Sequence, residues 1–178
     1  MEITSGRAFA AYWDGFRART TRVIAHIPAD RLERTPPGGT WTFGDLIRHL
    51  AGIERDMYGE NVQGLPSRYP GHDRSLADGY DAVVAYMDRK HREAMEIFAA
   101  LTPSRLQAKC MTPAGADITV WKWLRSMPEH EAHHRGQIHY MLSLMGIGAP
   151  PLYGLTEEEV HARSLHHDVR LPPGGAHA

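Results

Sequence analysis

The chain contains 178 residues, of which 42% are hydrophobic and 23% charged, and its formal net charge is −1. This length predicts one domain, or one domain with an appendage, which can fold without a disulfide or a structural metal. The 20 basic and 21 acidic residues give no overall attraction to nucleic acid or to an anionic membrane. We therefore expect neither as a partner.

Cysteine content and targeting signals indicate a cytoplasmic protein. Cys110 is the single cysteine, which excludes an internal disulfide and favours a reducing compartment. The first twenty residues carry charged side chains and no uninterrupted apolar core, unlike a signal peptide. No stretch approaches the ~18 apolar residues that a membrane span requires.

The first half of the chain has two strong helical patterns. Residues 3–27 carry apolar side chains at three- and four-residue spacing, which predicts a long helix. The Pro- and Gly-rich residues 36–39 predict a loop. Thr42 and Asp45 then match a variant of the capping box, and apolar residues at helical spacing continue to Met57. We expect a second long helix there.

The second half of the chain also has two long helical patterns. After a loop at residues 61–74, a third helix is expected from Ser75 to Leu101. Residues 104–118 have no clear period, and a turn signal at residues 113–115 is compatible with a short hairpin. A fourth long helix is expected from Thr119 to Gly146, because glycine commonly ends a helix.

The remaining residues predict little structure. Thr156 and Glu159 indicate one more short helix, and residues 172–178 predict a disordered tail. Four long helices joined by loops predict an all-α protein built as a helical bundle.

Twelve histidines are present against four phenylalanines, and two of the histidines share one face of the fourth helix. A helix turns by about 100° per residue, so His130 and His134 differ by about 40° and lie one turn apart. Both lie within about 60° of the apolar stripe, whereas His133 is about 120° away. We expect His133 and His139 to face solvent. A single inward histidine is usually a hydrogen-bonded core residue, but two inward histidines favour a metal site.

A third ligand should come from another helix. His49 on the second helix lies about 80° from the centre of its apolar stripe and is the natural candidate. His26 suits the C-terminal end of the helix dipole, and His91 belongs to the charged residues 89–92, which are typical of a solvated face. The other histidines fall in loops or near the tail and offer little: His72, His161, His166, His167 and His177.

Glu131 lies between the two paired histidines and has two interpretations. It is on the buried side of the helix, so it suits a general base or an acceptor for an imidazole N–H, and it equally suits an ion pair inside the bundle. Residues 130–134 also match the H-E-x-x-H pattern of zinc peptidases, but no substrate-binding strand is expected. Asp45 also has two interpretations. It suits a hydrogen-bond partner for a metal ligand, and it equally suits a charge at the start of the second helix.

Two further residues are candidates for the walls of a site. Gln137 lies close to the direction of the paired histidines, where it lines a pocket or forms a boundary. Trp41 precedes the second helix, where it covers the open end of a site or packs into the core.

The residues Leu46-Ile47-Arg48-His49-Leu50 and the segment His130-x-x-x-His134-Arg135-Gly136-Gln137, in a chain of four long helices, resemble the DinB-like superfamily. This family includes bacillithiol S-transferases and mycothiol-dependent relatives. The resemblance implies an up-down-down-up four-helix bundle in which His49, His130 and His134 hold a divalent metal, usually zinc or nickel. It also implies a homodimer.

The resemblance covers residues 3–147, so we assign residues 1–147 to the bundle and 148–178 to a C-terminal extension, partly disordered. Pro128 departs from the simplest pattern. A proline inside a helix removes one backbone hydrogen bond, so a kink or a restart is expected two residues before His130.

The chemistry of such a site suggests three functions. Three neutral imidazoles leave the full charge on the metal beside an open position, where a bound thiol is deprotonated and a bound water is acidified. The resemblance favours a thiol-dependent S-transferase that joins a low-molecular-weight thiol to a small-molecule electrophile, with Glu131 as its candidate catalytic residue. A non-catalytic metal-binding or stress-associated dimer and a metal-dependent small-molecule hydrolase remain alternatives.

Overall fold

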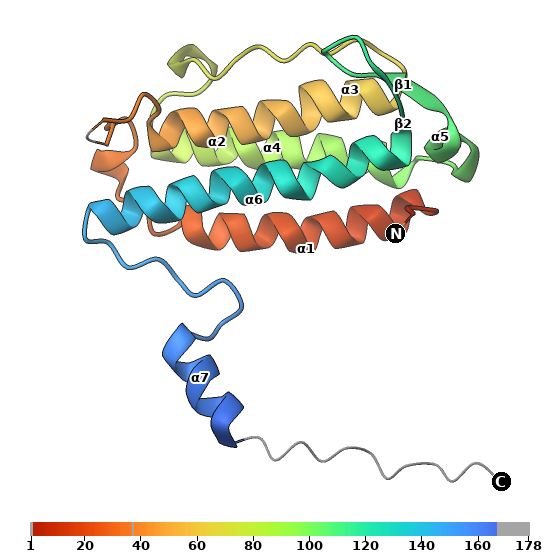
Figure 1. The fold of residues 1–178 in the computed structure, drawn as a ribbon. Helices are drawn as coiled ribbons and strands as arrows, with labels where there is room; N and C mark the ends of the chain where they lie inside the picture. The colour runs from red at the N-terminus through yellow and green to blue at the C-terminus, as the bar shows by residue number, and fades with distance from the viewer. Residues whose placement is uncertain (1, 37, 167–178) are drawn as a thin grey trace, which may run out of the picture.

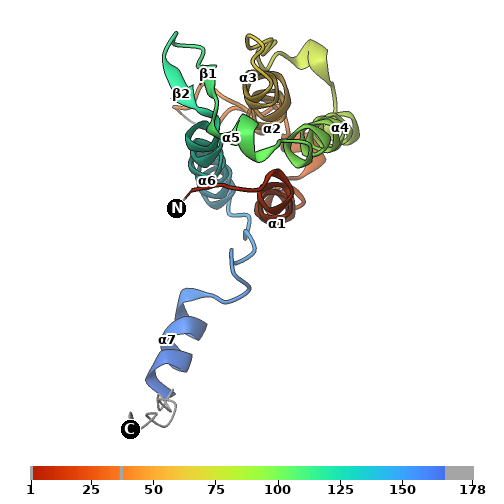
Figure 2. The same cartoon turned by 90° about the vertical axis from the view of Figure 1, so that its right-hand side faces the viewer.

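The computed structural model describes residues 2–36 and 38–166 of the chain. Four long helical segments form a bundle (Figure 1): α1 (Gly6–Ile24), α2 (Phe43–Gly52) with its continuation, α4 (Tyr80–Ala99) and α6 (Val120–Leu144). The chain runs in one direction along α2 and α4 and in the opposite direction along α1 and α6. An end-on view places the four helices around a common core (Figure 2). The predicted all-α, up-down-down-up four-helix bundle is confirmed.

The second helix extends further than the sequence indicates. It continues from α2 into a π-helical turn, η2 (Ile53–Tyr58), and then into α3 (Gly59–Val62). Such π-turns occur mostly as short insertions in α-helices, often at functional sites. Glu54 in this turn is only 2% exposed. The loop predicted at residues 61–74 therefore begins after Val62.

The third helix begins at Tyr80 and not at Ser75. Residues Arg74–Leu76 form a separate 3-10 turn, η3, in which the Ser75 amide donates to Asp73 Oδ1 over 2.8 Å. Gly79 follows with φ of 85°, a left-handed conformation that interrupts a helix and that glycine adopts without strain. The spacing of apolar residues does not record such a break.

Short elements connect the long helices. A 3-10 turn, η1 (Ala29–Arg31), follows α1, and α5 (Pro103–Gln107) follows α4. Strand β1 (Lys109–Met111) then pairs antiparallel with β2 (Asp117–Thr119). The short hairpin that the turn signal suggested is confirmed.

Beyond the bundle, α7 (Glu157–His166) confirms the short helix expected after Thr156. The Thr156 amide donates to Glu159 Oε2 over 2.7 Å, and the Glu159 amide donates back to Thr156 Oγ1 over 3.2 Å. The tail predicted at residues 172–178 lies outside the described residues. The division of the chain after residue 147 stays a prediction.

Helix α6 is continuous across Pro128, so the expected restart does not occur. Proline removes one backbone donor, but the side chains on its N-terminal side are firmly packed. Leu124 and Met127 are 0% and 1% exposed and belong to a core cluster with Trp13 and Phe98. Packing therefore holds the helix together where one hydrogen bond is missing.

Two clusters of buried apolar side chains fill the bundle. One lies around Phe43, Ile47 and Ile138, and the other lies around Trp13 and Phe98. Among the described residues, no helix is both long enough and apolar enough to cross a membrane. The cytoplasmic location stays a prediction.

A buried charged network links α1, η2, α4 and α6. Arg17 Nη2 donates to Glu54 Oε2 over 2.5 Å, and Arg17 Nη1 lies 3.2 Å from Glu131 Oε2. Glu54 also accepts hydrogen bonds from Trp13 Nε1 and His91 Nδ1, at 2.5 and 2.7 Å. Burial raises the pKa of Glu54, but Arg17, His91 and Trp13 outweigh burial and hold the pKa below its ordinary value. The solvated face predicted for His91 is therefore wrong.

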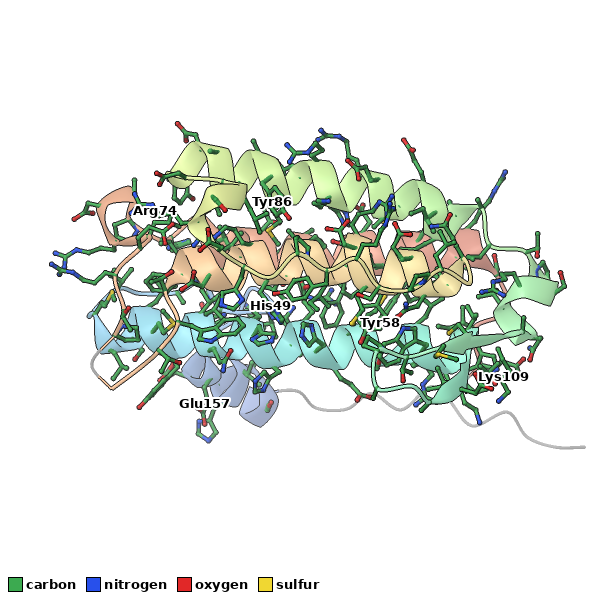
Figure 3. The ribbon with its side chains drawn as sticks, turned by 90° about the horizontal axis from the view of Figure 1, so that it is seen from above. His49, Tyr58, Arg74, Tyr86, Lys109 and Glu157 are labelled. Atoms are coloured by element: carbon green, nitrogen blue, oxygen red, sulfur yellow. The ribbon has the colours of Figure 1, made fainter. Side chains whose placement is uncertain are left out.

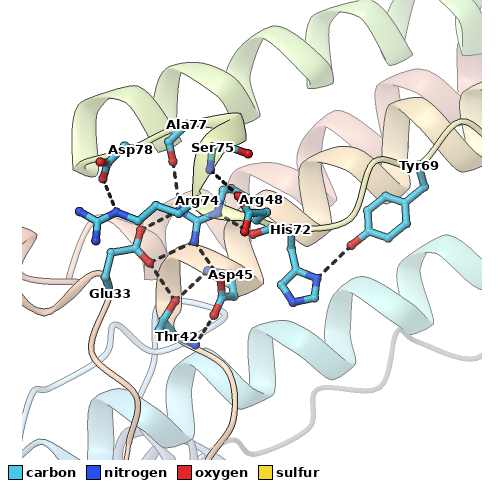
Figure 4. A network of polar contacts seen from close by, with 11 residues as sticks. Glu33, Thr42, Asp45, Arg48, Tyr69, His72, Arg74, Ser75, Ala77 and Asp78 are labelled. Carbon is cyan, nitrogen blue, oxygen red and sulfur yellow. Dashed lines mark hydrogen bonds and ion pairs between the residues drawn. The ribbon is translucent and has the colours of Figure 1, made fainter.

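Arg48, next to His49, ties α2 to the loops on either side of it (Figure 4). Its guanidinium donates to Glu33 Oε1 at 2.7 Å and to Asp45 Oδ1 at 2.9 Å. It also donates to the carbonyl oxygens of His72 and Ala77, at 2.8 and 3.1 Å. Because the side chain is 0% exposed, the loop residues that it binds are held at fixed places against the helix.

We expect Arg48→Met to lower the free energy of unfolding by about 2–3 kcal/mol, because it leaves two half-buried carboxylates, Glu33 and Asp45, without their buried cation. Urea unfolding at neutral pH measures the change. Arg74→Met is the matched control, since Arg74 is exposed and pairs only at the surface with Asp78, where an ion pair contributes little. Equal unfolding midpoints for the two variants would contradict this account of the Arg48 network.

Candidate metal centre

The structure brings together the three histidines that the sequence predicts as ligands. His49 lies on α2, in the middle of the bundle (Figure 3), and His130 and His134 lie on the facing side of α6. His49 Nε2 is 3.0 Å from His130 Nε2, which is 3.2 Å from His134 Nε2. One ligand atom from each residue lies within 4.8 Å of the other two, so the cluster could hold a metal ion.

The outer nitrogens of two imidazoles have their own partners. His134 Nδ1 lies 2.6 Å from Gln137 Oε1, and because an amide oxygen only accepts, Nδ1 donates and Nε2 keeps its lone pair. His49 Nδ1 lies 2.7 Å from the Tyr69 hydroxyl. With His49 Nδ1 as the donor, the His49 Nε2 lone pair also faces the centre. Lone pairs directed at one point repel each other unless a proton or a cation lies between them.

Electrostatics disfavours a second proton on these rings. Burial lowers the pKa of His49 to about 3, assisted by His134, His130 and His72. Burial also lowers the pKa of His130 to about 4, assisted by His134, His133 and Arg17. At neutral pH the cluster therefore offers neutral imidazoles, the form that binds a metal ion.

Tyr69, which no sequence pattern singled out, and His72, which offered little as a loop residue, both lie beside the cluster in the loop between α3 and α4. The Tyr69 hydroxyl is 3.4 Å from His72 Nδ1 in addition to its contact with His49. Arg48 holds the His72 carbonyl, and the Arg68 amide donates to the Asp56 carbonyl over 2.8 Å. No periodic pattern identifies these loop residues, because their position depends on contacts with distant parts of the chain.

Trp41 packs against the histidines. Its ring stacks on the His72 ring at a centroid distance of 4.1 Å and lies nearly parallel to the His134 ring at 5.9 Å. It meets His49 edge-on at 5.0 Å. Trp41 is half-buried, and these contacts favour its interpretation as a cover for the site over packing in the core alone.

The contacts of the two candidate carboxylates favour the structural interpretation of each. Glu131 is 1% exposed, and its carboxylate pairs with Arg17 of α1. Burial raises the pKa of Glu131 although Arg17 and Thr20 oppose it. Asp45 completes the predicted capping box with Thr42 and also binds Arg48. These contacts favour the bundle ion pair for Glu131 and the helix-start charge for Asp45, and the catalytic role of Glu131 stays a prediction. This arrangement also disfavours a peptidase, whose glutamate must act at the metal.

Two other histidines, His133 and His139, were expected to face solvent, and the structure agrees for one of them. His133 is exposed, as predicted, whereas His139 is half-buried. Cys110 is buried in β1 at one end of the bundle, next to Lys109 (Figure 3). Burial raises the pKa of its thiol, which disfavours the reactive thiolate.

We expect Tyr69→Phe to weaken zinc binding by about 10- to 100-fold, since it removes the partner that orients the His49 ring. A competition titration against a chromogenic zinc chelator measures the affinity. Tyr58→Phe is the control, because the Tyr58 hydroxyl binds Ser126 Oγ over 2.7 Å and does not contact the histidines. The orienting role of Tyr69 fails if both variants bind zinc as tightly as the unaltered protein.

Comparison with known proteins is consistent with this geometry. The family model of the DinB superfamily matches residues 12–138. Among solved structures, the chain is similar to a DinB-like protein from Bacillus cereus ATCC 10987, with 18% identity and a TM-score of 0.62, over 80% of this chain and 94% of that chain. No protein of curated function matches. The structural similarity establishes the fold, and the family model spans most of the bundle. The chain belongs to the DinB superfamily.

Proposed function

We propose that the protein binds a divalent cation through His49, His130 and His134 and acts as a thiol-dependent S-transferase on a small-molecule electrophile. The observation that carries the proposal is the convergence of three imidazole nitrogens within 4.8 Å of one another. On the resemblance alone, we also propose that the protein is a homodimer.

The donor set favours zinc or nickel. Imidazole nitrogen suits these ions, whereas magnesium and calcium prefer oxygen ligands. The carboxylates of Glu131 and Asp45 are engaged by Arg17 and Arg48, and the converging side chains of the described residues are histidines alone. The site therefore presents nitrogen atoms only.

When bound, a divalent cation with three neutral ligands lowers the pKa of a coordinating thiol or water. The protein residues orient and shield this position. Tyr69 and Gln137 hold the outer nitrogens of two histidines, and Trp41 covers the cluster.

The reacting sulfur must come from a cosubstrate. Cys110 is the only cysteine of the chain and is buried. In the overall reaction, the sulfur of a low-molecular-weight thiol forms a bond to the electrophilic carbon. The leaving group departs with the bonding electron pair, and the thiol proton passes to solvent.

We expect His49→Ala, His130→Ala and His134→Ala each to reduce the metal content sharply, because each removes one of three ligands. His133→Ala should retain the metal, since His133 is exposed and is not one of the three histidines whose nitrogens converge. Elemental analysis of protein purified without a nickel column measures the metal and its stoichiometry. Equal loss in all four variants would overturn the assignment of the ligands.

The zinc- or nickel-loaded protein should accelerate the reaction of a low-molecular-weight thiol with monobromobimane, which becomes fluorescent when thiol displaces its bromide. A panel of cysteine, glutathione, bacillithiol and mycothiol identifies the thiol. The acceleration should disappear after metal removal and in His49→Ala, but persist in His133→Ala.

Two other results would contradict the S-transferase. No acceleration with any thiol and a broad panel of electrophiles would indicate a non-catalytic metal-binding protein. Metal-dependent turnover of esters or amides without added thiol would indicate a hydrolase.

A further inference from the structure

A groove beside the three histidines has an uncharged lining. It encloses about 340 Å³ between the residues that precede α2 and the C-terminal half of α6. Its side chains are mainly apolar: Trp41, Leu46, Gln137, Tyr140, Met141 and Leu144. Residues 36 and 38–40 complete the rim, and none of these lining residues carries a charge.

The groove combines a firm floor with an exposed apolar wall. Leu46 and Met141 are 2% and 6% exposed and belong to the core, so the floor cannot collapse easily. Tyr140 and Leu144 are 66% and 53% exposed and are among the most exposed large apolar side chains of the described residues. Exposed apolar side chains gathered beside a hollow are typical of a binding site.

Two lining residues also contact the histidine cluster. The Trp41 ring lies 5.9 Å from the His134 ring, at an angle of 8°. Gln137 Oε1 accepts from His134 Nδ1 at 2.6 Å, which leaves the two amide N–H donors of Gln137 for another partner. A molecule in the groove therefore has one end beside a candidate metal ligand.

The volume and the lining select the class of occupant. A volume of about 340 Å³ lies at the small end of the ligand-binding range of roughly 300–1,000 Å³. Burying a charge without a partner costs much more than burying an apolar group. A cavity of about 490 Å³ between the start of α1 and α6 is different, because Glu2, Arg125 and Glu129 line it.

We propose that the groove binds the apolar part of an uncharged electrophilic substrate and that Gln137 donates a hydrogen bond to a polar atom of that substrate. This inference rests on the proposed S-transferase function. Trp41 offers a flat face for an aromatic or conjugated group, which places the reacting carbon next to the cluster. The groove thus determines specificity for the electrophile.

Binding is tested first without metal, thiol or turnover. The uncharged fluorescent probe N-phenyl-1-naphthylamine should bind the unaltered protein, and Leu144→Glu should weaken its binding at least about 10-fold, because it places a charge on the apolar wall. Leu144 is exposed, so the variant should fold. Tyr12→Glu is the matched control: Tyr12 is 54% exposed and lines the other cavity. Equal affinities for the two variants would overturn the proposal.

Specificity is tested next with the metal-loaded protein. Monobromobimane is uncharged, and its trimethylammonium derivative carries a positive charge. Leu144→Glu should raise KM for the uncharged compound and shift the kcat/KM ratio toward the cationic one, while Tyr12→Glu leaves that ratio unchanged. A ratio that Leu144→Glu does not move would contradict a role for the groove in substrate recognition.

The two proposals fail in different ways. If no electrophile is turned over but Leu144→Glu alone weakens probe binding, the S-transferase fails and the apolar binding site stands. If turnover is observed and probe binding is unaffected by Leu144→Glu, the groove proposal fails alone. If Leu144→Glu converts a dimer to monomers in sedimentation analysis without changing probe affinity, the groove is an interface between copies and the proposal is overturned.

Discussion

Three imidazole nitrogens held within 4.8 Å of one another are the constraint on which the rest of this site depends. His130 Nε2 lies within hydrogen-bond distance of both other nitrogens, so one N–H can serve one neighbour, whereas a second proton would add repulsion between charges. The arrangement therefore requires α2 and α6 to face each other across the bundle. The hydrogen bonds of Tyr69 and Gln137 to the outer nitrogens then orient two of the three rings.

Two buried arginines hold the elements around the site in place. Arg17 joins Glu54 of the π-turn to Glu131 of α6, and Arg48 joins the start of α2 to the loops around it. Buried ion pairs contribute little net stability when they replace apolar packing, but losing one partner is costly. Such pairs therefore penalise any packing that separates the helices, and so they favour one arrangement of the bundle.

The same arginines influence the chemistry of the site. Glu131 follows His130 in sequence, and Asp45 lies one turn before His49, so either carboxylate is near a candidate ligand along the chain. Each is instead engaged by an arginine. A cation on the histidines would keep its charge, because within the described part of the chain no carboxylate joins the three histidines, and the adjoining groove offers an uncharged surface. The contrast between these two environments suits a polarised nucleophile beside an apolar electrophile.

The amino-acid sequence by itself determined the features that depend on local geometry. The rotation of an α-helix places His130 and His134 on one face and His133 on another, and local hydrogen bonding accounts for the capping box at Thr42. Only the tertiary structure decided the roles of residues without a helical period. Tyr69 and His72 reach the cluster because a loop returns along the bundle, and His91 is half-buried because Glu54 of the π-turn lies opposite it. These contacts join residues far apart in the chain, where local spacing carries no information.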